Sequence, residues 1–352
     1  MTDLLSRHDV LLADLDGTLY AGPAAIPGAV DAVRNAADRG VRTAYITNNA
    51  SRAPADVAAH LAELGFPATT DDVVTSSQAA AAMLARQLAP GSPVLVVGTA
   101  ALAAELTAVG LGITDRADQA TAVVQGHSPD TGWRLLAEAT VALRAGAVWV
   151  ACNLDPTLPT ERGPLPGNGS MVAAVRTATG REPQVAGKPE PTLLLDAVRR
   201  TGSRSALMIG DRLDTDVEGG RAAGMATLLV LTGVSDAAEL LAAPAERRPD
   251  YVGADMAALT RSADELAPGP RPGWEVTADG SGSLTVTGSG EPLDALLALC
   301  AAHWADGGGP VQVRAEGDDA DRALRSLGLD VDAGAAGSAT VATADTATGA
   351  RR

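Results

Sequence analysis

The sequence predicts an α/β protein built on a parallel sheet, with a second α/β block inserted into the first and a small α+β module at the C-terminus. Three observations support this prediction. Short apolar runs alternate with helical patterns through most of the chain. A block with its own strand and helix rhythm separates two groups of such units. The proline- and glycine-rich stretch 266–273 is then followed by a different pattern of predicted elements.

The first unit is a strand, a helix and a second strand. DVLLADL (9–15) is predicted to be a buried strand, and VRTAYIT (41–47) the next one. Between them, residues 27–40 are predicted to be a helix, because proline stands at its start and glycine at its end. The same rhythm resumes with predicted strands at 205–210 and 226–231.

The middle of the chain has enough elements for a separate α/β domain. We therefore predict a core at 1–78 and 185–265 with a cap inserted at 79–184. The predicted cap strands are 93–98, 121–126 and 146–152, and the predicted cap helices are 99–110 and 131–146. Trp133 and Trp149 are interpreted as parts of the cap core.

A C-terminal module is predicted at 272–335, followed by a flexible tail at 336–352. Its order is a hairpin, a helix, a strand and a helix, which resembles a fragment of an acetyltransferase-like fold. We find no pyrophosphate loop for coenzyme A, so acetyl transfer is not predicted. Because a hairpin alone buries little apolar surface, the module should pack on the core or cap or mediate self-association. We expect it to supply no catalytic group.

The composition limits the partners. The 352 residues include 43 acidic and 27 basic side chains, which gives a net charge of −16. Such a field repels nucleic acid and anionic lipid, so neither is expected as a partner. No apolar stretch approaches the length of a membrane span. Two distant cysteines, Cys152 and Cys300, suit a reducing compartment, and we expect a cytoplasmic protein.

Polar motifs follow three of the predicted strands. Asp14 and Asp16 lie in DLDGT, and residues two apart on an extended chain project to the same side. TNN (47–49) follows the second strand, and GDRLDTD (210–216) follows the strand at 205–210. Each motif alone also suits a turn or a helix start. Because open α/β sheets bind ligands beyond the carboxyl ends of their strands, the motifs are expected to meet.

Lys188 is the only lysine in the chain and stands in GKPEP, between a glycine and a proline. A lone lysine is usually a solvated surface cation. Carboxylates that share a pocket with a phosphate need a cation, however, and a compact ammonium can bridge two anions as a point charge. A planar guanidinium is a poor substitute in such a place. We therefore predict that Lys188 serves the site formed by the motifs.

Taken in order, D-x-D-G-T, T-N-N, G-K-P-E-P and G-D-x-x-x-T-D make the chain resemble a phosphatase of the haloacid dehalogenase-like superfamily, subfamily IIA, over about residues 8–260. The resemblance implies a Rossmann-like core with an α/β cap. It also implies a nucleophile at Asp14, a general acid and base at Asp16, and Mg²⁺ bound by Asp14, the Asp16 carbonyl and Asp211. The other roles implied are phosphate binding by Thr47, Asn48 and Lys188 and support of the metal by Asp216.

Asp16 distinguishes reactions within this superfamily, because a second carboxylic acid can protonate a leaving group and later activate water. The resemblance therefore implies hydrolysis of an aspartyl-phosphate. A non-enzymatic sensor of a phosphorylated metabolite is the alternative. In the cap loop 152–171 we predict that Asn153 and Asp155 read the leaving group, with Arg162, Asn168 and Ser170 as further candidates.

The resemblance favours a small phosphorylated metabolite as substrate, because a cap closes over the site. Glycerol 3-phosphate is the expected ester, since relatives with an extra C-terminal module include glycerol 3-phosphate phosphatases. The alternatives are 2-phosphoglycolate, pyridoxal 5′-phosphate and nucleoside monophosphates.

Overall fold

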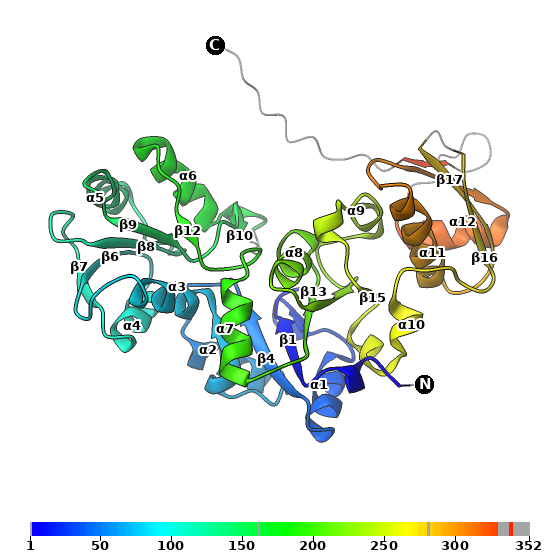
Figure 1. The fold of residues 1–352 in the computed structure, drawn as a ribbon, viewed down its shortest axis with the longest axis horizontal. Coiled ribbons are helices and arrows are strands. Elements are labelled where there is room, and N and C mark those ends of the chain that lie inside the picture. The colour runs from blue at the N-terminus through cyan, green and yellow to red at the C-terminus, as the bar shows by residue number, and fades with distance from the viewer. Residues whose placement is uncertain (1, 159, 161, 280–281, 330–337, 341–352) are drawn as a thin grey trace, which may run out of the picture.

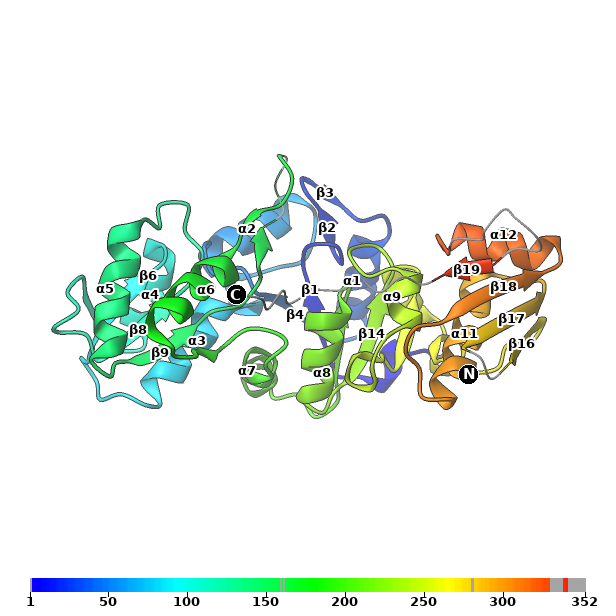
Figure 2. The same cartoon turned by 90° about the horizontal axis from the view of Figure 1, so that it is seen from above.

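The computed structural model describes residues 2–158, 160, 162–279, 282–329 and 338–340. Three units lie in a row, with the core in the middle, the cap at one end and the C-terminal module at the other (Figures 1 and 2). The predicted class is confirmed: the structure is an α/β protein with parallel-sheet units and a small C-terminal domain. No helix among the described residues has the length and apolarity that a membrane span needs.

The core is a six-stranded parallel sheet in the order β15-β14-β13-β1-β4-β5. Its central strand β1 pairs with β4 on one side and with β13 on the other. Because the strands are parallel, Asp14, Thr47 and Gly210 all lie at the same edge of the sheet. The strands are β1 (Val10–Asp14), β4 (Arg42–Thr47), β5 (Val73–Thr75), β13 (Ala206–Gly210), β14 (Ala226–Val230) and β15 (Tyr251–Gly253).

Helices cover both faces of this sheet because β1 is apolar on both sides. Leu11 and Ala13 pack in one cluster with α1 (Ala29–Asp38) and α2 (Pro54–Glu63). Val10 and Leu12 pack in another with α3 (Ser76–Ala85) and α7 (Thr192–Thr201). The core also contains the hairpin β2 (Tyr20–Ala21) and β3 (Ala24–Ala25) and the helices α8 (Glu218–Ala222), α9 (Ala237–Leu241) and α10 (Ala263–Leu266).

The cap is a five-stranded parallel sheet in the order β12-β9-β8-β6-β7. The three predicted strands correspond to β6, β8 and β9 and the two predicted helices to α4 and α5, whereas β7, β12 and α6 were not predicted. The strands are β6 (Pro93–Val97), β7 (Gly112–Thr114), β8 (Ala122–Gln125), β9 (Val148–Ala151) and β12 (Gln184–Val185). The helices are α4 (Ala100–Ala108), α5 (Trp133–Arg144) and α6 (Asn168–Thr179), and β10 (Thr157–Leu158) pairs with β11 (Leu165–Pro166).

Two secondary-structure elements cross the predicted boundaries between the core and the cap. Helix α3 spans the predicted boundary at 78/79, and its alanines contact strands of both sheets. Strand β12 spans the boundary at 184/185 and belongs to the cap sheet. The exact domain limits therefore stay predictions.

One prediction about the cap core is wrong. Trp149 is buried in the cap sheet, as expected, but the side chain of Trp133 is 81% exposed. Trp133 is the first residue of α5, and the buried face of this helix is formed by Ala139, Ala142 and Leu143. Its position on the helix, rather than its apolar character, decides its exposure.

The C-terminal module is a four-stranded sheet in the order β16-β17-β18-β19, in which β17 and β18 are parallel. It consists of β16 (Trp274–Ala278), β17 (Ser283–Gly288), α11 (Pro292–Ala305), β18 (Gln312–Glu316), α12 (Asp318–Ser326) and β19 (Ser338–Thr340). Strand β19 falls in the predicted flexible tail and pairs with β18, which would otherwise end the sheet with unpaired backbone groups. The rest of the tail, 336–337 and 341–352, lies outside the described residues.

The module packs on the core, which was one of its predicted arrangements. Apolar residues of α9 and β14 share one cluster with β17 and α11. Trp304 Nε1 donates to Leu241 O at 3.1 Å, and the Arg248 guanidinium lies 5.2 Å from the centre of the Trp304 ring. The hairpin side chains Trp274, Leu284 and Val286 are buried in the same cluster.

We predict that Trp304→Ala lowers the free energy of unfolding by about 2 kcal/mol, because it removes buried ring contacts and leaves the Leu241 carbonyl without its donor. Chemical denaturation of the full chain measures this. Trp133→Ala is the matched control, since an exposed tryptophan should change stability by less than about 0.5 kcal/mol. Equal effects of the two substitutions would contradict the packing described for Trp304.

Candidate active site

The motif DLDGT forms a tight turn at the end of β1. The Leu15 carbonyl accepts from Leu19 N at 2.8 Å, and Gly17 N donates to Tyr20 O at 2.8 Å. Gly17 has a φ of +81°, and a Cβ at this position would lie 2.3 Å from Asp211 Oδ2. Only glycine therefore allows the turn to approach the second acidic strand end so closely.

Lys188 lies at the centre of the site. Its Nζ is 2.5 Å from Asp14 Oδ1 and 2.5 Å from Asp216 Oδ1, and its side chain is only 2% exposed. Lys188 thus contacts two of the motifs, one at the end of β1 and one in the turn after β13. The phosphate binding implied for Lys188 stays a prediction. An ammonium can donate to both carboxylates at once from a single point.

Main-chain donors fix Asp216 and a further aspartate, Asp211, beside Lys188. Asp211 Oδ2 accepts from Val234 N at 2.7 Å, and Asp211 Oδ1 lies 3.5 Å from Thr18 Oγ1. Asp216 Oδ2 accepts from Arg212 N at 3.1 Å, within the single π-helical turn of Leu213–Val217. Both carboxylates are buried, at 1% exposure each. Their positions are therefore set by main-chain donors rather than by solvent.

Burial dominates the protonation of this cluster. It raises the pKa of Asp14, Asp211 and Asp216 above the ordinary aspartate value, and the attraction of Lys188 opposes the shift in each case. Burial also acts to lower the pKa of Lys188, but the charges of Asp14 and Asp216 outweigh it and the pKa is raised. Lys188 is therefore charged at neutral pH.

The carboxylates fit a small divalent cation. One oxygen each of Asp14, Asp211 and Asp216 lies within 4.8 Å of the other two. Oxygen ligands of this kind are what Mg²⁺ prefers. The Asp216 carboxylate, expected as support of the metal, lies in this group, while the exposed Asp16 side chain does not. Which of these residues bind the metal stays a prediction. The role expected for Asp16 in metal binding used its main-chain carbonyl and stays a prediction.

The side chain of Asn48 is engaged with the main chain of Lys188. Its Oδ1 accepts from Lys188 N at 2.8 Å, and its Nδ2 donates to Lys188 O at 3.0 Å. The Asn48 carbonyl accepts from Ser76 Oγ and from Asn153 Nδ2, at 2.6 and 2.7 Å. Phosphate binding by Asn48 stays a prediction. The two bonds of its side-chain amide position the main chain of Lys188. Thr47 is buried and accepts from Asn49 N at 3.1 Å.

The cap reaches this site through the loop after β9. Asn153 contacts Asn48, and Asp155 Oδ2 lies 3.5 Å from Asn48 Nδ2, so both predicted cap residues come to the core. Asn168 and Ser170 instead bond to main-chain carbonyls of the cap, and the Arg162 side chain is exposed.

Several residues that contact the active-site motifs were not predicted from the sequence. Tyr20 OH lies 3.5 Å from Asp16 Oδ2 and packs edge to face against the His60 ring. The loop after β14 contributes Val234 N and also Thr232, whose Oγ1 donates to Gly17 O at 2.6 Å. A signal was available for this loop, because it follows a predicted strand of the same sheet as the recognised motifs.

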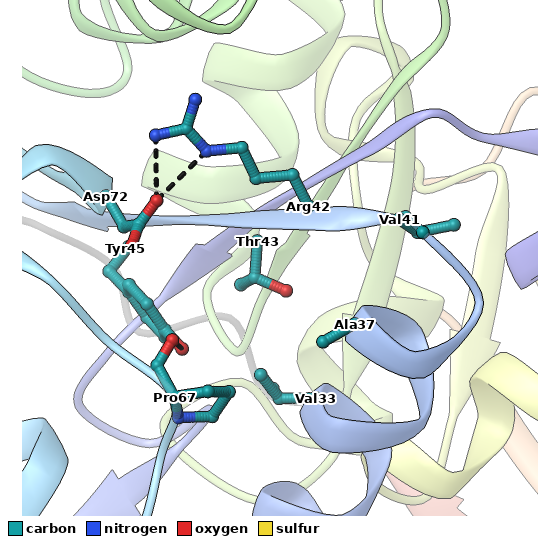
Figure 3. A pocket seen from close by; sticks show the side chains of 9 residues that line it. Val33, Ala37, Val41, Arg42, Thr43, Tyr45, Pro67 and Asp72 are labelled. Atoms are coloured by element: carbon teal, nitrogen blue, oxygen red, sulfur yellow. Dashed lines mark hydrogen bonds and ion pairs between the residues drawn. The ribbon is translucent and has the colours of Figure 1, made fainter.

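A separate cavity of about 270 Å³ lies at the opposite end of β4 from Thr47. Figure 3 shows Thr43 and Tyr45 beside it, with the Arg42–Asp72 ion pair at its rim. It therefore plays no part in the cluster around Lys188.

We predict that Lys188→Arg lowers kcat by at least about 100-fold, although it keeps the charge, because the larger planar group cannot occupy the same point between two carboxylates. Steady-state kinetics with p-nitrophenyl phosphate measure this once a transition midpoint confirms folding. Arg199→Lys is the matched control, since Arg199 is exposed and, among the residues that the structure describes, forms an ion pair only with Asp196. Full activity of Lys188→Arg would show that any cation suffices.

Comparison with known protein families divides the chain in the same way. The haloacid dehalogenase-like hydrolase family matches residues 11–112, and a second hydrolase family of the same kind matches residues 185–259. The GCN5-related N-acetyltransferase-like domain family matches residues 271–329, which agrees with the fold resemblance noted for the C-terminal module.

Two curated relatives extend the comparison. D-glycerol 3-phosphate phosphatase of Mycobacterium tuberculosis is 55% identical over 295 residues, which are 84% of this chain and 82% of that protein. Acid sugar phosphatase of Staphylococcus aureus is 37% identical over 233 residues, which are 66% of this chain and 89% of that protein.

Solved structures agree with these relatives. Crystal structures of glycerol phosphate phosphatase from M. tuberculosis match with TM-scores of 0.88 for the calcium complex and 0.87 for the magnesium complex. Their identities are 50% and 51%, and the matches cover 93% of this chain and 98% and 99% of theirs.

Proposed function

The chain belongs to the haloacid dehalogenase-like hydrolase family, and we propose that it is a Mg²⁺-dependent phosphatase that hydrolyses small phosphate monoesters, with glycerol 3-phosphate as its preferred substrate. The observation that carries the proposal is the buried contact of Lys188 with Asp14 and Asp216 beside the Asp211 carboxylate. In the proposal, these residues provide a nucleophile, a cation for phosphate and a metal site at the carboxyl edge of the core sheet. The agreement with phosphatase relatives supports the same reaction class.

In the proposed reaction, a carboxylate oxygen of Asp14 attacks phosphorus and the ester bond to the leaving-group oxygen breaks. Asp16 gives its proton to that oxygen, so the alcohol leaves as a neutral molecule. Asp16, now a carboxylate, takes a proton from water, and the resulting hydroxide attacks phosphorus. This step breaks the bond to Asp14 and releases inorganic phosphate. Lys188 holds Asp14 Oδ1 in place throughout.

Mg²⁺ held by Asp14, Asp211 and the Asp16 carbonyl, with the Asp216 carboxylate in support beside them, would supply positive charge to the phosphoryl oxygens. The carboxylates of Asp14, Asp211 and Asp216 are held in place before a ligand arrives, because Lys188 fixes Asp14 and main-chain donors fix the other two. Asp16 differs from them, since its side chain is exposed and free to reach a leaving group. This difference in burial suits Asp14 to act as the nucleophile and Asp16 to act as the general acid and base.

Glycerol 3-phosphate is proposed as the substrate from similarity over most of the chain, C-terminal module included. The cap packs on the core beside the site, which favours small esters over phosphoproteins. 2-Phosphoglycolate, pyridoxal 5′-phosphate and nucleoside monophosphates are the alternatives. A cytoplasmic location and self-association also stay proposals.

We predict that Asp14→Asn lowers kcat by roughly 10,000-fold or more while folding is kept, because the amide is nearly isosteric but is no nucleophile. Phosphate release from glycerol 3-phosphate and from the alternative esters, compared by kcat/KM, tests the reaction and the substrate together. Wild-type protein without Mg²⁺-dependent release, as judged against EDTA, would favour the sensor alternative. A clear preference for another ester would displace glycerol 3-phosphate alone.

We predict that Mg²⁺ raises the melting temperature more at pH 7.5 than at pH 5. The folded-state pKa values of Asp14 and Asp211 are raised by burial, so their stabilising contribution is full below the unfolded value of about 4 and is lost as pH rises through the folded values. Mg²⁺ binds the deprotonated carboxylates and offsets this loss.

Thermal unfolding with and without Mg²⁺ at the two pH values measures the difference, with a Na⁺ salt of equal ionic strength as the control. Asp211→Asn should reduce the Mg²⁺ effect at pH 7.5. An equal Mg²⁺ effect at both pH values would argue against carboxylates with raised pKa values as the metal ligands.

A further inference from the structure

The carboxylate of Asp16 has a different environment from the other carboxylates of the site. Lys188 or main-chain donors hold the carboxylates of the metal group. In the part of the chain that the structure describes, the Asp16 carboxylate has one hydrogen-bond partner, the hydroxyl of Tyr20, with 3.5 Å between Tyr20 OH and Asp16 Oδ2. The orientation of an exposed side chain therefore depends on a single neighbouring group.

Tyr20 is fixed through both its main chain and its ring. Its carbonyl accepts from Gly17 N at 2.8 Å and its N–H donates to Leu15 O at 3.2 Å, so Tyr20 closes the turn that carries Asp16. The ring is buried in one apolar cluster with Leu15. It also meets the His60 ring of α2 edge to face, with 5.2 Å between the ring centres. The Tyr20 hydroxyl therefore has little freedom to move away from Asp16.

A tyrosine hydroxyl is chemically suited to this position. A phenol keeps its proton at neutral pH and can donate one hydrogen bond. Here it lies against Oδ2, one of the two carboxyl oxygens of Asp16. When Oδ2 accepts from Tyr20, the transferable proton of Asp16 lies on the other oxygen, Oδ1. The contact is long for an O–H···O bond, and hydrogen bonds of catalytic groups often shorten once the substrate is bound.

We propose that Tyr20 positions Asp16 for proton transfer: its hydroxyl holds Oδ2, so that Oδ1 faces the leaving group. The inference rests on the proposed function and adds a positioning residue to it. In the first step the Oδ1–H bond breaks, the proton binds the leaving-group oxygen, and the bond from that oxygen to phosphorus breaks. In the second step Oδ1 takes a proton from water. Tyr20 keeps its own proton in both steps and acts through Asp16.

This role should make the effect of Tyr20 depend on the leaving group. The alkoxide of glycerol is strongly basic and needs a proton as it departs, whereas p-nitrophenolate is weakly basic and departs without one. The ratio kcat/KM reports the steps up to this departure and is not affected by later hydrolysis of the aspartyl-phosphate. A misplaced Asp16 should therefore slow the alkyl ester much more than the aryl ester.

The test compares kcat/KM for glycerol 3-phosphate and p-nitrophenyl phosphate, with Mg²⁺, in full-length wild type and in Tyr20→Phe, which keeps the ring and removes the hydroxyl. We expect kcat/KM to fall by about tenfold or more for glycerol 3-phosphate and by less than about threefold for p-nitrophenyl phosphate. Tyr45→Phe is the matched control and should leave both values unchanged. It removes a buried hydroxyl that donates to Pro67 O at 3.3 Å, beside the separate cavity.

A double-mutant cycle distinguishes action through Asp16 from direct contact with the ester. In Asp16→Asn no transferable proton remains to be positioned. Tyr20→Phe added to Asp16→Asn should therefore change kcat/KM for glycerol 3-phosphate by less than about twofold. A residue that contacts the substrate itself would cause the same fractional loss in both backgrounds.

The outcomes separate this inference from the proposed function. A wild type that releases phosphate from neither ester overturns the proposed function. If the wild type prefers one of the alternative esters, that ester replaces glycerol 3-phosphate, since each of them also leaves as an alcohol. In an active wild type, an equal loss on the alkyl and aryl esters, no loss on the alkyl ester, or the same loss in Asp16→Asn overturns the role of Tyr20 alone. If Tyr20→Phe does not fold, Tyr20→Met gives the same comparison, because it also lacks the hydroxyl and can fill the apolar space.

Discussion

The buried ammonium of Lys188 is the interaction on which the site depends. Asp14, Asp211 and Asp216 bring three carboxylates into one small, largely buried region, and such a group is unstable without a cation. Lys188 supplies one permanent charge between Asp14 and Asp216. The geometry around it follows: glycine at 17 lets the turn approach Asp211, and glycine at 210 leaves room for the Asp216 carboxylate.

The same lysine connects the cap to the chemistry. The side-chain amide of Asn48 bonds to both the N–H and the carbonyl of Lys188. The main-chain carbonyl of Asn48 in turn accepts a hydrogen bond from Asn153 Nδ2 of the cap loop. A displacement of the cap loop would therefore act on the residue that positions Lys188. This arrangement gives a physical reason why the substrate loop and the catalytic cation belong to one hydrogen-bonded unit, although they come from separate parts of the sequence.

The C-terminal module is linked to the core by apolar packing rather than by catalytic groups. Its helix α11 packs against α9, which follows the loop that supplies Val234 N to Asp211. The module thus packs on the helix that follows the active-site loop. None of its described residues belongs to the cluster around Lys188.

The strands β1, β4, β6, β8, β9, β13 and β14, the helices α1, α4 and α5, and the elements of the C-terminal module other than β19 were predictable. They follow local patterns: apolar runs, proline and glycine at helix ends, and polar residues just after strands. Parallel strands then bring Asp14, Thr47 and Asp211 to one edge, so their meeting was also predictable. The exposure of Trp133, the pairing of the Asn48 amide with Lys188 and the entry of Asp216 into the carboxylate group were not. The last two depend on contacts between segments distant in the sequence, such as Asn48 with Lys188, and the exposure of Trp133 depends on which face of α5 is buried. The order of residues determines which groups reach the strand edge, and the packing of separate elements determines which of their hydrogen bonds remain free for a ligand.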